Sequence, residues 1–570
     1  MKSTAYLVWL FLASAGIFGQ VVDVTIVAAP GTVTLEPGVT DSAWLFNNQL
    51  PGPVIRVLEG TRLRTRLINQ LPEETNIHFH GVRMPVGMDG VRMTRPPVEP
   101  GQEFLYDFVV PDPGTYFFHP HIGLQLDRGL AGVLIVDPLV PYPPVTQEHV
   151  IVLDDWATGV PNLANPPTHG NYLLNGKTSN GQTPYLVNPG DTVRFHLINA
   201  ASNTNFVVTL DGHPMTVTHT DGQPILPITT TALPIGMGER YLVEVTANNP
   251  GSWSLAAASL MNRNSTLVRG IFRYNGTPAP DPSPSFVPTD LATAPLLTYD
   301  LMQSLGSVVP ISSVPSVTHP VTLARFPAGG PNGWTLNGAQ FPNTAPLMVS
   351  FGQTVRVDML SVTPHHHPMH LHGHFFRVLN TVGGTTQPLV KDTVLMPNTV
   401  GAQTSFEFVA DNPGAWMFHC HNLYHAEGGM MTMVMYMMGD QDLDGLGDGM
   451  DWDPLSPFPV LSATPNGGGF AIGSTPRLSL QWPMGTIGYF FIGSDEPNPV
   501  PLGPAGFAYI QPITLLGSAM ANTGDQVELF VPIPNNPALV GGIARLQGAA
   551  THPTLLGGLR ASTYWRIHIQ

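Results

Sequence analysis

Cysteine is nearly absent from this 570-residue chain, which has only one, Cys420. A single thiol excludes an internal disulfide and leaves Cys420 free, reactive or bound to a metal. Charged residues are also scarce, at 11%, and Asp and Glu outnumber Lys and Arg by 39 to 23. The resulting net charge of −16 argues against a nucleic-acid partner, which would need a basic surface.

Apolar runs long enough to span a membrane are missing as well. The chain starts "MKSTAYLVWLFLASAGIFGQ", with one Lys, a short apolar stretch and then small residues. This pattern predicts a signal peptide over residues 1–20, with a buried first strand as the alternative. We therefore expect a protein that is secreted, periplasmic or held at the cell surface.

Glycine and proline are abundant, at 59 each, and 43% of the residues are hydrophobic. This composition favours many short strands and tight turns over long charged helices. The length allows three or four domains at roughly 100–200 residues each. We expect an all-β protein.

One unit recurs three times along the chain. It begins "NNQLPGPVIRVLEGTRLRTRLIN" (47–69), "NGKTSNGQTPYLVNPGDTVRFHLIN" (175–199) and "NGAQFPNTAPLMVSFGQTVRVDML" (337–360). Apolar residues alternate on both sides of Gly60, Gly190 and Gly352, which predicts two strands joined by a turn in each copy. The repetition indicates one supersecondary unit used three times.

Histidine pairs occur in the first and third copies only. His78 and His370 each lie 18 residues after the turn glycine, and "PGTYFFHPH" (113–121) and "PGAWMFHCH" (413–421) end in further pairs. A lone His on a strand is usually structural, but His-x-His places both rings on one face of a strand. The pattern predicts one metal cluster shared by the two outer copies. Its members are His78, His80, His119, His121, His370, His372, His419 and His421, and the middle copy has Val208, Leu210, Ala256 and Ala258 at equivalent places.

A second ligand set surrounds the cysteine. His367, Cys420, His425 and Met430 offer two imidazoles, a thiolate and a thioether, the set of blue-copper electron-transfer sites. Structural zinc usually brings two or more cysteines at short spacing. The eight other histidines also suit copper, and they could hold three ions with positions open to oxygen. Cys420 would then bind one copper while its neighbours in the chain bind the cluster.

The strings "IHFHG" (77–81), "FFHPH" (117–121), "HPMHLHG" (367–373) and "HCHNLYHAEGGM" (419–430) resemble the four copper motifs of the multicopper oxidases, the laccase-like group. The resemblance covers about residues 21–438. It implies three cupredoxin-like Greek-key β-sandwich domains, with the copper cluster between the first and the third. It also implies four copper ions: one type 1, one type 2 and two type 3.

Carried over by motif, the resemblance assigns every ligand. It implies that His78 and His370 bind the type 2 ion. The type 1 ligands would be His367, Cys420, His425 and Met430, and the type 3 ligands His80, His119, His121, His372, His419 and His421.

The implied reaction couples four one-electron oxidations of a small reducing substrate to reduction of O2 to water. Phenols or aromatic amines are the favoured donors, since Met430 as axial ligand favours a low to moderate copper potential. Alternatives are a metallo-oxidase of Cu(I), Fe(II) or Mn(II), a copper nitrite reductase, which would lack the eight-histidine cluster, and a non-catalytic copper-holding surface protein.

Protons must also reach the cluster. Asp89, in "MDGV", matches the Asp-Gly after the family's first motif and is nominated as an acid or proton relay; a turn-forming Asp-Gly is the alternative. Some bacterial relatives have a carboxylate directly after the last type 1 histidine. Here that residue is Ala426, with Glu427 one place further on.

The predicted domains are residues 21–140, 141–290 (without copper ligands) and 291–439 (with the type 1 site). In "MMTMVMYMM" (430–438), Met431, Met433 and Met435 favour core packing over a copper-loading patch. His365 and His366 extend a "HHHP" run, and we expect them to be exposed and to bind no copper.

The composition changes after Met438. Asp440, Asp442, Asp444, Asp448 and Asp451, in residues 440–454, have the spacing of an EF-hand-like calcium loop, with a solvated acidic linker as the alternative. Residues 455–570 alternate apolar residues with Gly and Pro, which predicts a small C-terminal β-domain.

Overall fold

The computed structural model describes residues 20–437, apart from 158, 165–168, 306–313, 327–331 and 381–388. Beyond residue 437 it describes the backbone of seven strands between residues 461 and 568. The predicted signal peptide lies outside this part except for Gln20, and the acidic loop lies wholly outside it. In the described part, no helix is both long and apolar enough to cross a membrane.

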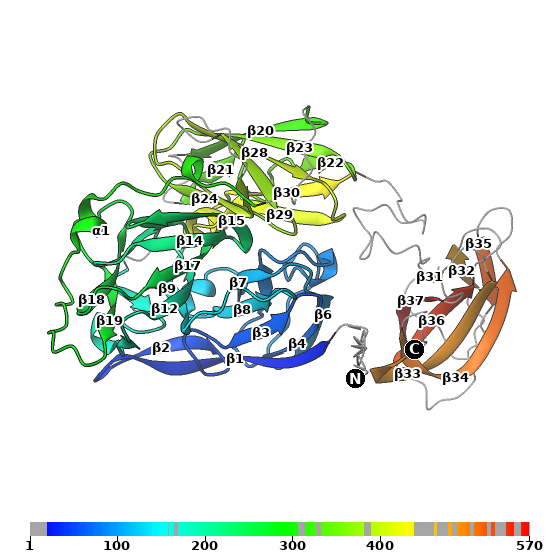
Figure 1. The fold of residues 1–570 in the computed structure, drawn as a ribbon. Coiled ribbons are helices and arrows are strands. Elements are labelled where there is room, and N and C mark those ends of the chain that lie inside the picture. Colours follow the sequence, from blue (N-terminus) through cyan, green and yellow to red (C-terminus); the bar gives the residue numbers. More distant parts are fainter. Residues whose placement is uncertain are drawn as a thin grey trace, which may run out of the picture. The chain divides into compact units, whose positions relative to one another are not determined.

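The first β-sandwich is built from strands β1 to β8 (Figure 1). In β4 every second side chain is buried, as the period of a strand requires. One sheet has the order β2-β1-β4-β6 and the other β3-β8-β7-β5. The strands are β1 (Val21–Glu36), β2 (Val39–Phe46), β3 (Val54–Leu58), β4 (Arg62–Asn69), β5 (His78–His80), β6 (Glu103–Val109), β7 (Gly114–His119) and β8 (Gly132–Asp137), with short 3-10 turns η1 (Val86–Met88) and η2 (Leu126–Arg128).

The second sandwich encloses the largest apolar core, built from side chains of both sheets. Its sheets have the orders β10-β9-β12-β17-β14-β15 and β11-β19-β18-β13-β16. The strands are β9 (Gln147–Trp156), β10 (Asn171–Leu174), β11 (Tyr185–Val187), β12 (Thr192–Asn199), β13 (Phe206–Leu210), β14 (Met215–Thr220), β15 (Gln223–Thr230), β16 (Leu233–Ile235), β17 (Arg240–Thr246), β18 (Ser252–Ser259) and β19 (Val268–Tyr274), with the turn η3 (Ser179–Gly181).

The third sandwich repeats the same plan, with sheets β21-β20-β23-β28-β25-β26 and β22-β30-β29-β24-β27. Its strands are β20 (Val317–Arg325), β21 (Trp334–Leu336), β22 (Leu347–Val349), β23 (Thr354–Ser361), β24 (His367–Leu371), β25 (Phe376–Asn380), β26 (Leu389–Lys391), β27 (Thr393–Met396), β28 (Ala402–Val409), β29 (Ala415–Cys420) and β30 (Met431–Tyr436). Helix α1 (Thr289–Thr293) and the turn η4 (Tyr299–Leu301) precede it, and helix α2 (Leu423–Glu427) follows β29.

The predicted repeat is visible in the strand pairing. The first long strand of each sandwich pairs in parallel with a later one: β1 with β4, β9 with β12 and β20 with β23. The turn glycines Gly60, Gly190 and Gly352 all have positive φ, which favours glycine at these tight turns. The all-β, cupredoxin-type fold is therefore confirmed.

The C-terminal region is also made of strands. Two sheets, β31-β32-β35 and β34-β33-β36-β37, account for its described residues. The strands are β31 (Leu461–Ala463), β32 (Arg477–Gln481), β33 (Ile487–Pro501), β34 (Phe507–Met520), β35 (Gln526–Phe530), β36 (Ile543–Thr551) and β37 (Arg560–His568).

Candidate metal centres

The alternation of side chains along two paired strands sorts the predicted ligands into two groups. In β24, His367 and Met369 lie on one face and His370 on the other. The antiparallel register places Met369 opposite Cys420 of β29, and His370 opposite His419. Because paired residues share a face, Cys420 lies on the side of His367, whereas His419 lies on the side of His370.

The first group gathers around the cysteine. The Sγ of Cys420 is 3.7 Å from Nδ1 of His367 and 3.5 Å from Nδ1 of His425, and these two nitrogens are 3.2 Å apart. All three side chains are buried, as is Met430. Three of the four predicted type 1 ligands, His367, Cys420 and His425, are thus brought together around one point.

Helix α2 places His425 in this group. The side chain of Asn422 caps the helix by accepting hydrogen bonds from the backbone N–H groups of Tyr424 and His425. On its outer side the His425 ring packs on Trp334, with 3.7 Å between ring centroids. His365 stands edge-on to Trp334 at 5.2 Å.

The second group is contributed by the first and third sandwiches. His78 pairs with His119 across β5 and β7, just as His370 pairs with His419 across β24 and β29. Rings from the two sandwiches stack: His78 on His372 at 3.8 Å, and His80 on His370 at 3.7 Å. His121 and His421 complete the set of eight predicted histidines, each within 5.2 Å of another ring of the group.

Burial lowers the pKa, and so favours the neutral form, of the imidazoles of His80, His119, His121, His370, His372, His419 and His421. It lowers the pKa of His119 to about 3 and that of His419 to about 4, and it holds the pKa of His370 well below its usual range. Neutral imidazole is the form that binds metal. Burial also raises the pKa of the Cys420 thiol, so metal binding there must displace its proton.

Six buried ring nitrogens of the group have no hydrogen-bond partner among the described residues. They are Nε2 of His78, His119 and His370, Nδ1 of His80 and both nitrogens of His421. A buried polar atom without a partner is costly, so six such atoms in one cluster indicate a missing ligand. An all-imidazole set fits copper.

Asp89 contacts two of the cluster histidines. Its Oδ2 is 2.9 Å from Nδ1 of His372, and its Oδ1 is 3.2 Å from Nδ1 of His78. It also ends the turn η1, with Gly90 at positive φ behind it. Asp89 therefore both ends a turn and lies beside the cluster, so the turn interpretation and the proton-relay interpretation of the Asp-Gly motif are compatible.

The structure adds a carboxylate that the sequence analysis missed. Asp392, between β26 and β27, lies with Oδ1 3.2 Å from Nε2 of His80, and its backbone oxygen is 2.8 Å from Nδ1 of His370. Its carboxylate forms two hydrogen bonds with Arg240 of the second sandwich. No local motif marks it, because its partners are 312 and 152 residues away.

A small cleft opens toward the cluster beside α2. His119, His121 and His419 line it together with Glu427, which is half-buried. Burial raises the pKa of Glu427. A carboxyl group therefore does face this side of the cluster, one residue later than in the bacterial pattern.

Other expectations are also settled by burial. Met431 and Met433 are buried, as core packing requires, whereas Met435, also predicted to pack in the core, is half-buried. His365 and His366, which we expected to be exposed, are half-buried, and Nδ1 of His366 hydrogen-bonds the backbone oxygen of Met396. The residues that replace histidine in the middle copy, Val208, Leu210, Ala256 and Ala258, are buried apolar residues of the second sandwich.

Comparison with known proteins places this arrangement in a family. Three multicopper oxidase domain models match residues 28–140, 146–277 and 315–440. The multicopper oxidase MmcO of Mycobacterium tuberculosis is 35% identical over 461 residues, covering 74% of this chain and 88% of that protein. Laccase-1 of Trametes villosa is 30% identical over 478 residues, covering 74% and 90%. The chain belongs to the multicopper oxidase family.

The solved structure of Fet3p, described as a multicopper oxidase that functions in iron import, has a TM-score of 0.65. It is 21% identical and covers 73% of this chain and 90% of its own, a likeness that concerns the fold. Family membership makes this protein a copper-binding oxidoreductase that uses oxygen and acts on a small-molecule substrate.

Proposed function

We propose that this multicopper oxidase is laccase-like: it couples four one-electron oxidations of a phenolic or aromatic amine donor to the reduction of O2 to two waters. The observation that carries the proposal is the environment of His425. Trp334 packs on its ring, and, after burial, the groups that hold its pKa down are His367, His365 and Arg325. Aromatic and basic surroundings suit a phenol ring better than a metal cation.

Four copper ions would be held as the motifs imply. His367, Cys420, His425 and Met430 would bind the type 1 ion, and His78 and His370 the type 2 ion. The type 3 pair would be held by His80, His119, His121, His372, His419 and His421. Bound copper would supply the one-electron redox chemistry and the oxygen-binding positions.

The protein's contribution to electron transfer would be the short stretch of backbone around Cys420, which connects the two ligand groups. The Cys420 side chain belongs to one ligand group, and the preceding and following histidines belong to the other. Because the alternation of β29 directs neighbours to opposite faces, the two groups are joined by one or two peptide units. This supports Cys420, His419 and His421 as the residues that carry electrons inward.

Two carboxyl groups are positioned to handle protons on opposite sides of the cluster. Asp89 contacts Nδ1 of His78 and His372, and can hold or release a proton beside them. Glu427 lines the cleft at His121 and His419, where burial favours its protonated form. We assign Asp89 the role of proton relay and Glu427 a second route from solvent.

A metallo-oxidase of Cu(I), Fe(II) or Mn(II) is the alternative. It would need acidic or methionine side chains on the approach to His425. Arg325, whose guanidinium lies 5.1 Å from the Trp334 ring centre, disfavours a cationic donor at this entrance.

Oxygen uptake by the copper-loaded protein tests the proposal. A phenolic donor, Cu(I) and Fe(II) are compared, with Cys420→Ser as the control that breaks the electron path. Fast uptake with the phenol that is lost in Cys420→Ser is the expected result. Uptake with the metal ions alone would transfer the function to metal oxidation, and no uptake with any donor would contradict the enzyme assignment.

We further propose that the chain is exported by a signal peptide over residues 1–20, since the laccase relative and the apolar start of the chain agree with an extracytoplasmic site of action. Calcium binding by Asp440, Asp442, Asp444, Asp448 and Asp451 is a second proposal. Calorimetric titration of the full chain with Ca²⁺ tests it: one saturable site is expected, and none would leave the segment as an acidic linker.

A further inference from the structure

We propose that Asp392, held by Arg240 of the copper-free second sandwich, is a positioning residue for the copper cluster. It decides which ring nitrogen of His80 is left free to bind metal, and it orients His370. The inference rests on the ligand assignment proposed above.

His80 is oriented differently from its neighbours in the cluster. Nδ1 of His119 and Nδ1 of His370 each hydrogen-bond a backbone oxygen, which leaves Nε2 facing the centre. In His80 the arrangement is reversed: Nε2 is bonded at 3.2 Å to the Asp392 carboxylate, and Nδ1 is the atom without a partner among the described residues.

A carboxylate can only accept a hydrogen bond, so Nε2 of His80 must carry the proton and donate it. The other nitrogen, Nδ1, is then unprotonated and ready to bind a metal ion. Thr393 supports the same arrangement, since its Oγ1 lies 3.1 Å from Nε2 of His80 and 3.2 Å from Nδ1 of His370. Asp392 and Thr393 thus orient one ligand from each of the two outer sandwiches.

Arg240 fixes the carboxylate. Its Nη1 and Nη2 donate to the two oxygens of Asp392 at 2.7 and 2.6 Å, a bidentate geometry that holds the plane of the carboxylate. Two further N–H groups of Arg240 are also used, because Nη1 donates to the Gly238 oxygen and Nε to the Thr115 oxygen. Arg240 is fully buried; although burial alone would lower its pKa, Asp392 and Asp221 raise it, so it stays charged.

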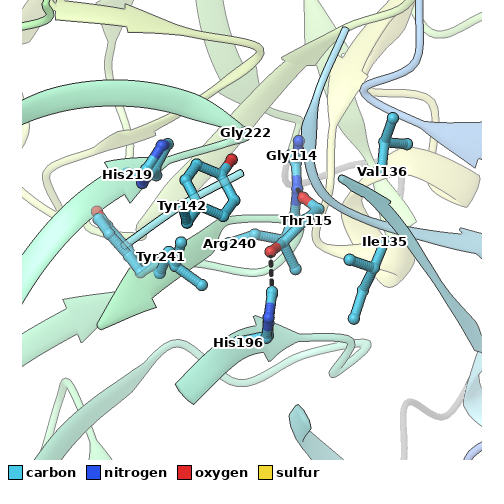
Figure 2. Close-up of a pocket in the computed structure, with 11 residues that line it drawn as sticks. Gly114, Thr115, Ile135, Val136, Tyr142, His196, His219, Gly222, Arg240 and Tyr241 are labelled. Atoms are coloured by element: carbon cyan, nitrogen blue, oxygen red, sulfur yellow. Dashed lines mark hydrogen bonds between the residues drawn. The ribbon is translucent and has the colours of Figure 1, made fainter. Parts of the chain in front are cut away.

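Figure 2 shows Arg240 beside Thr115 of the first sandwich and His196 of the second, on the side of Arg240 that faces away from Asp392. Thr115 of β7 accepts from Arg240 through its backbone oxygen and hydrogen-bonds His196 of β12 through its side chain, at 2.5 Å. On the side of Gly81 the space beside the guanidinium is filled, because a Cβ added to Gly81 would clash with Asp392 Oδ2 and Arg240 Nη2.

Asp221 binds the backbone beside both Arg240 and Asp392. Its Oδ1 accepts from the backbone N–H of Arg240 at 3.0 Å, and its Oδ2 accepts from the backbone N–H of Thr393 at 3.2 Å. Lys391 bonds Asp221 and Glu239 at 3.0 and 2.9 Å. The second sandwich, which has no predicted copper ligand, therefore acts on the cluster through this buried ionic network.

A purely structural role for the network is the competing explanation, since buried ion pairs often serve only to join domains. The two explanations differ in what they predict for residues at opposite ends of the network. Asp392 contacts His80 and His370, whereas Glu239, equally buried, contacts Lys391 and Tyr299. Only the proposal predicts that the cluster responds to a change at Asp392 and not to a change at Glu239.

The experiment compares Asp392→Asn with Glu239→Gln in the full-length protein. Copper per chain is measured by metal analysis after dialysis at graded free copper, and the type 1 and type 2 ions are followed by optical and electron paramagnetic resonance spectra. In Asp392→Asn, we expect the affinity of the cluster positions to fall about 10–100-fold, as for other residues that orient a ligand, with the type 1 spectrum unchanged. Glu239→Gln should keep the copper content and both spectra of the wild type.

Arg240→Lys is the second variant, for the case that Asp392→Asn does not fold. This variant keeps the positive charge but loses the bidentate hydrogen bonds to Asp392. The proposal predicts a smaller loss of copper affinity than in Asp392→Asn, confined to the cluster. Equal copper loss in the Asp392 and Glu239 variants, or unchanged cluster affinity and spectra in both Asp392→Asn and Arg240→Lys, would overturn the proposal. A wild-type protein that binds fewer than four coppers would overturn the ligand assignment as well.

Discussion

At the residue scale, the position of Asp89 explains how two ring tautomers are fixed and where a proton acceptor lies. Asp89 closes the turn η1, and its two carboxylate oxygens lie against His78 and His372, which we propose as ligands of two different copper types. A carboxylate there fixes the ring tautomers and is itself a proton acceptor beside the oxygen-binding positions.

We predict that Asp89→Asn slows oxygen reduction about 10–100-fold, because the amide cannot take up a proton and can donate where the histidines need an acceptor. The measurement is the rate at which the fully reduced, copper-loaded protein is re-oxidised by O2. Asp107→Asn, which weakens half-buried ion pairs with Arg62 and Arg64 away from the cluster, is the matched control and should leave this rate unchanged. Equal rates for wild type and Asp89→Asn would contradict the assigned role.

Acid should destabilise the copper-free protein through its buried histidines. His119 keeps a pKa of about 3 when folded but an ordinary value of 6.5 when unfolded, so between these values the unfolded chain binds more protons. Stability is then fully present above pH 6.5 and is lost as pH falls toward 3, by up to about 1.4 kcal/mol per pH unit for each such histidine. Urea unfolding at graded pH measures this slope. His119→Gln should reduce it, and a copper-free protein equally stable at pH 6.5 and pH 4 would contradict the account.

Residue types and spacings were enough to predict that the eight histidines gather in one cluster and that His367 and His425 lie beside Cys420, because the His-x-His pairs and the single cysteine are local patterns and strands have a fixed period. That these residues bind copper stays a prediction. Asp392 and Arg240 could not be predicted in this way. Their meaning comes from contacts between sandwiches, and neither residue stands in a motif that is complete within one segment of the chain.

At the scale of elements, α2 is the piece that completes the type 1 group. The sequence pattern predicted strands and turns, and this five-residue helix after β29 was not foreseen. Its signal is the single capping residue Asn422, which is weak beside the strong β-pattern around it. The strands themselves were predictable because apolar alternation and glycine turns recur in three copies.

We predict that Asn422→Ala costs about 1 kcal/mol of stability and weakens the type 1 site, because two helix N–H groups lose their acceptor and one of them belongs to His425. Urea unfolding and the blue absorption of the copper-loaded protein are the measurements. Asn422→Ser, which keeps a capping oxygen, should recover most of both. If serine does no better than alanine, the cap is not what positions His425.

At the scale of the whole described molecule, the sandwiches are joined by charges as well as by apolar cores. Asp221, Glu239 and Arg240 of the second sandwich meet Lys391 and Asp392 of the third, and all five are buried. Burial alone would lower the pKa of Lys391, but Asp221 and Glu239 raise it, so the network contains charged partners on both sides.

We predict that Lys391→Met destabilises the protein by about 3–5 kcal/mol, because Glu239 would lose its buried cationic partner and Asp221 would keep only Arg240. Arg56→Met is the control: it breaks a surface pair with Asp137 and should cost about 0–1 kcal/mol. Urea unfolding compares the two. Similar losses in both variants would show that the buried network does not couple the sandwiches.

The central claim is that electrons from a small donor enter at the cysteine site and reduce O2 by four electrons at the histidine cluster. The most direct test is to add a known, limiting amount of a phenolic donor to the copper-loaded protein and to measure the oxygen consumed and any hydrogen peroxide formed. The account predicts one O2 for every four electrons supplied and no peroxide. One O2 for every two electrons, with an equal amount of peroxide, would contradict it.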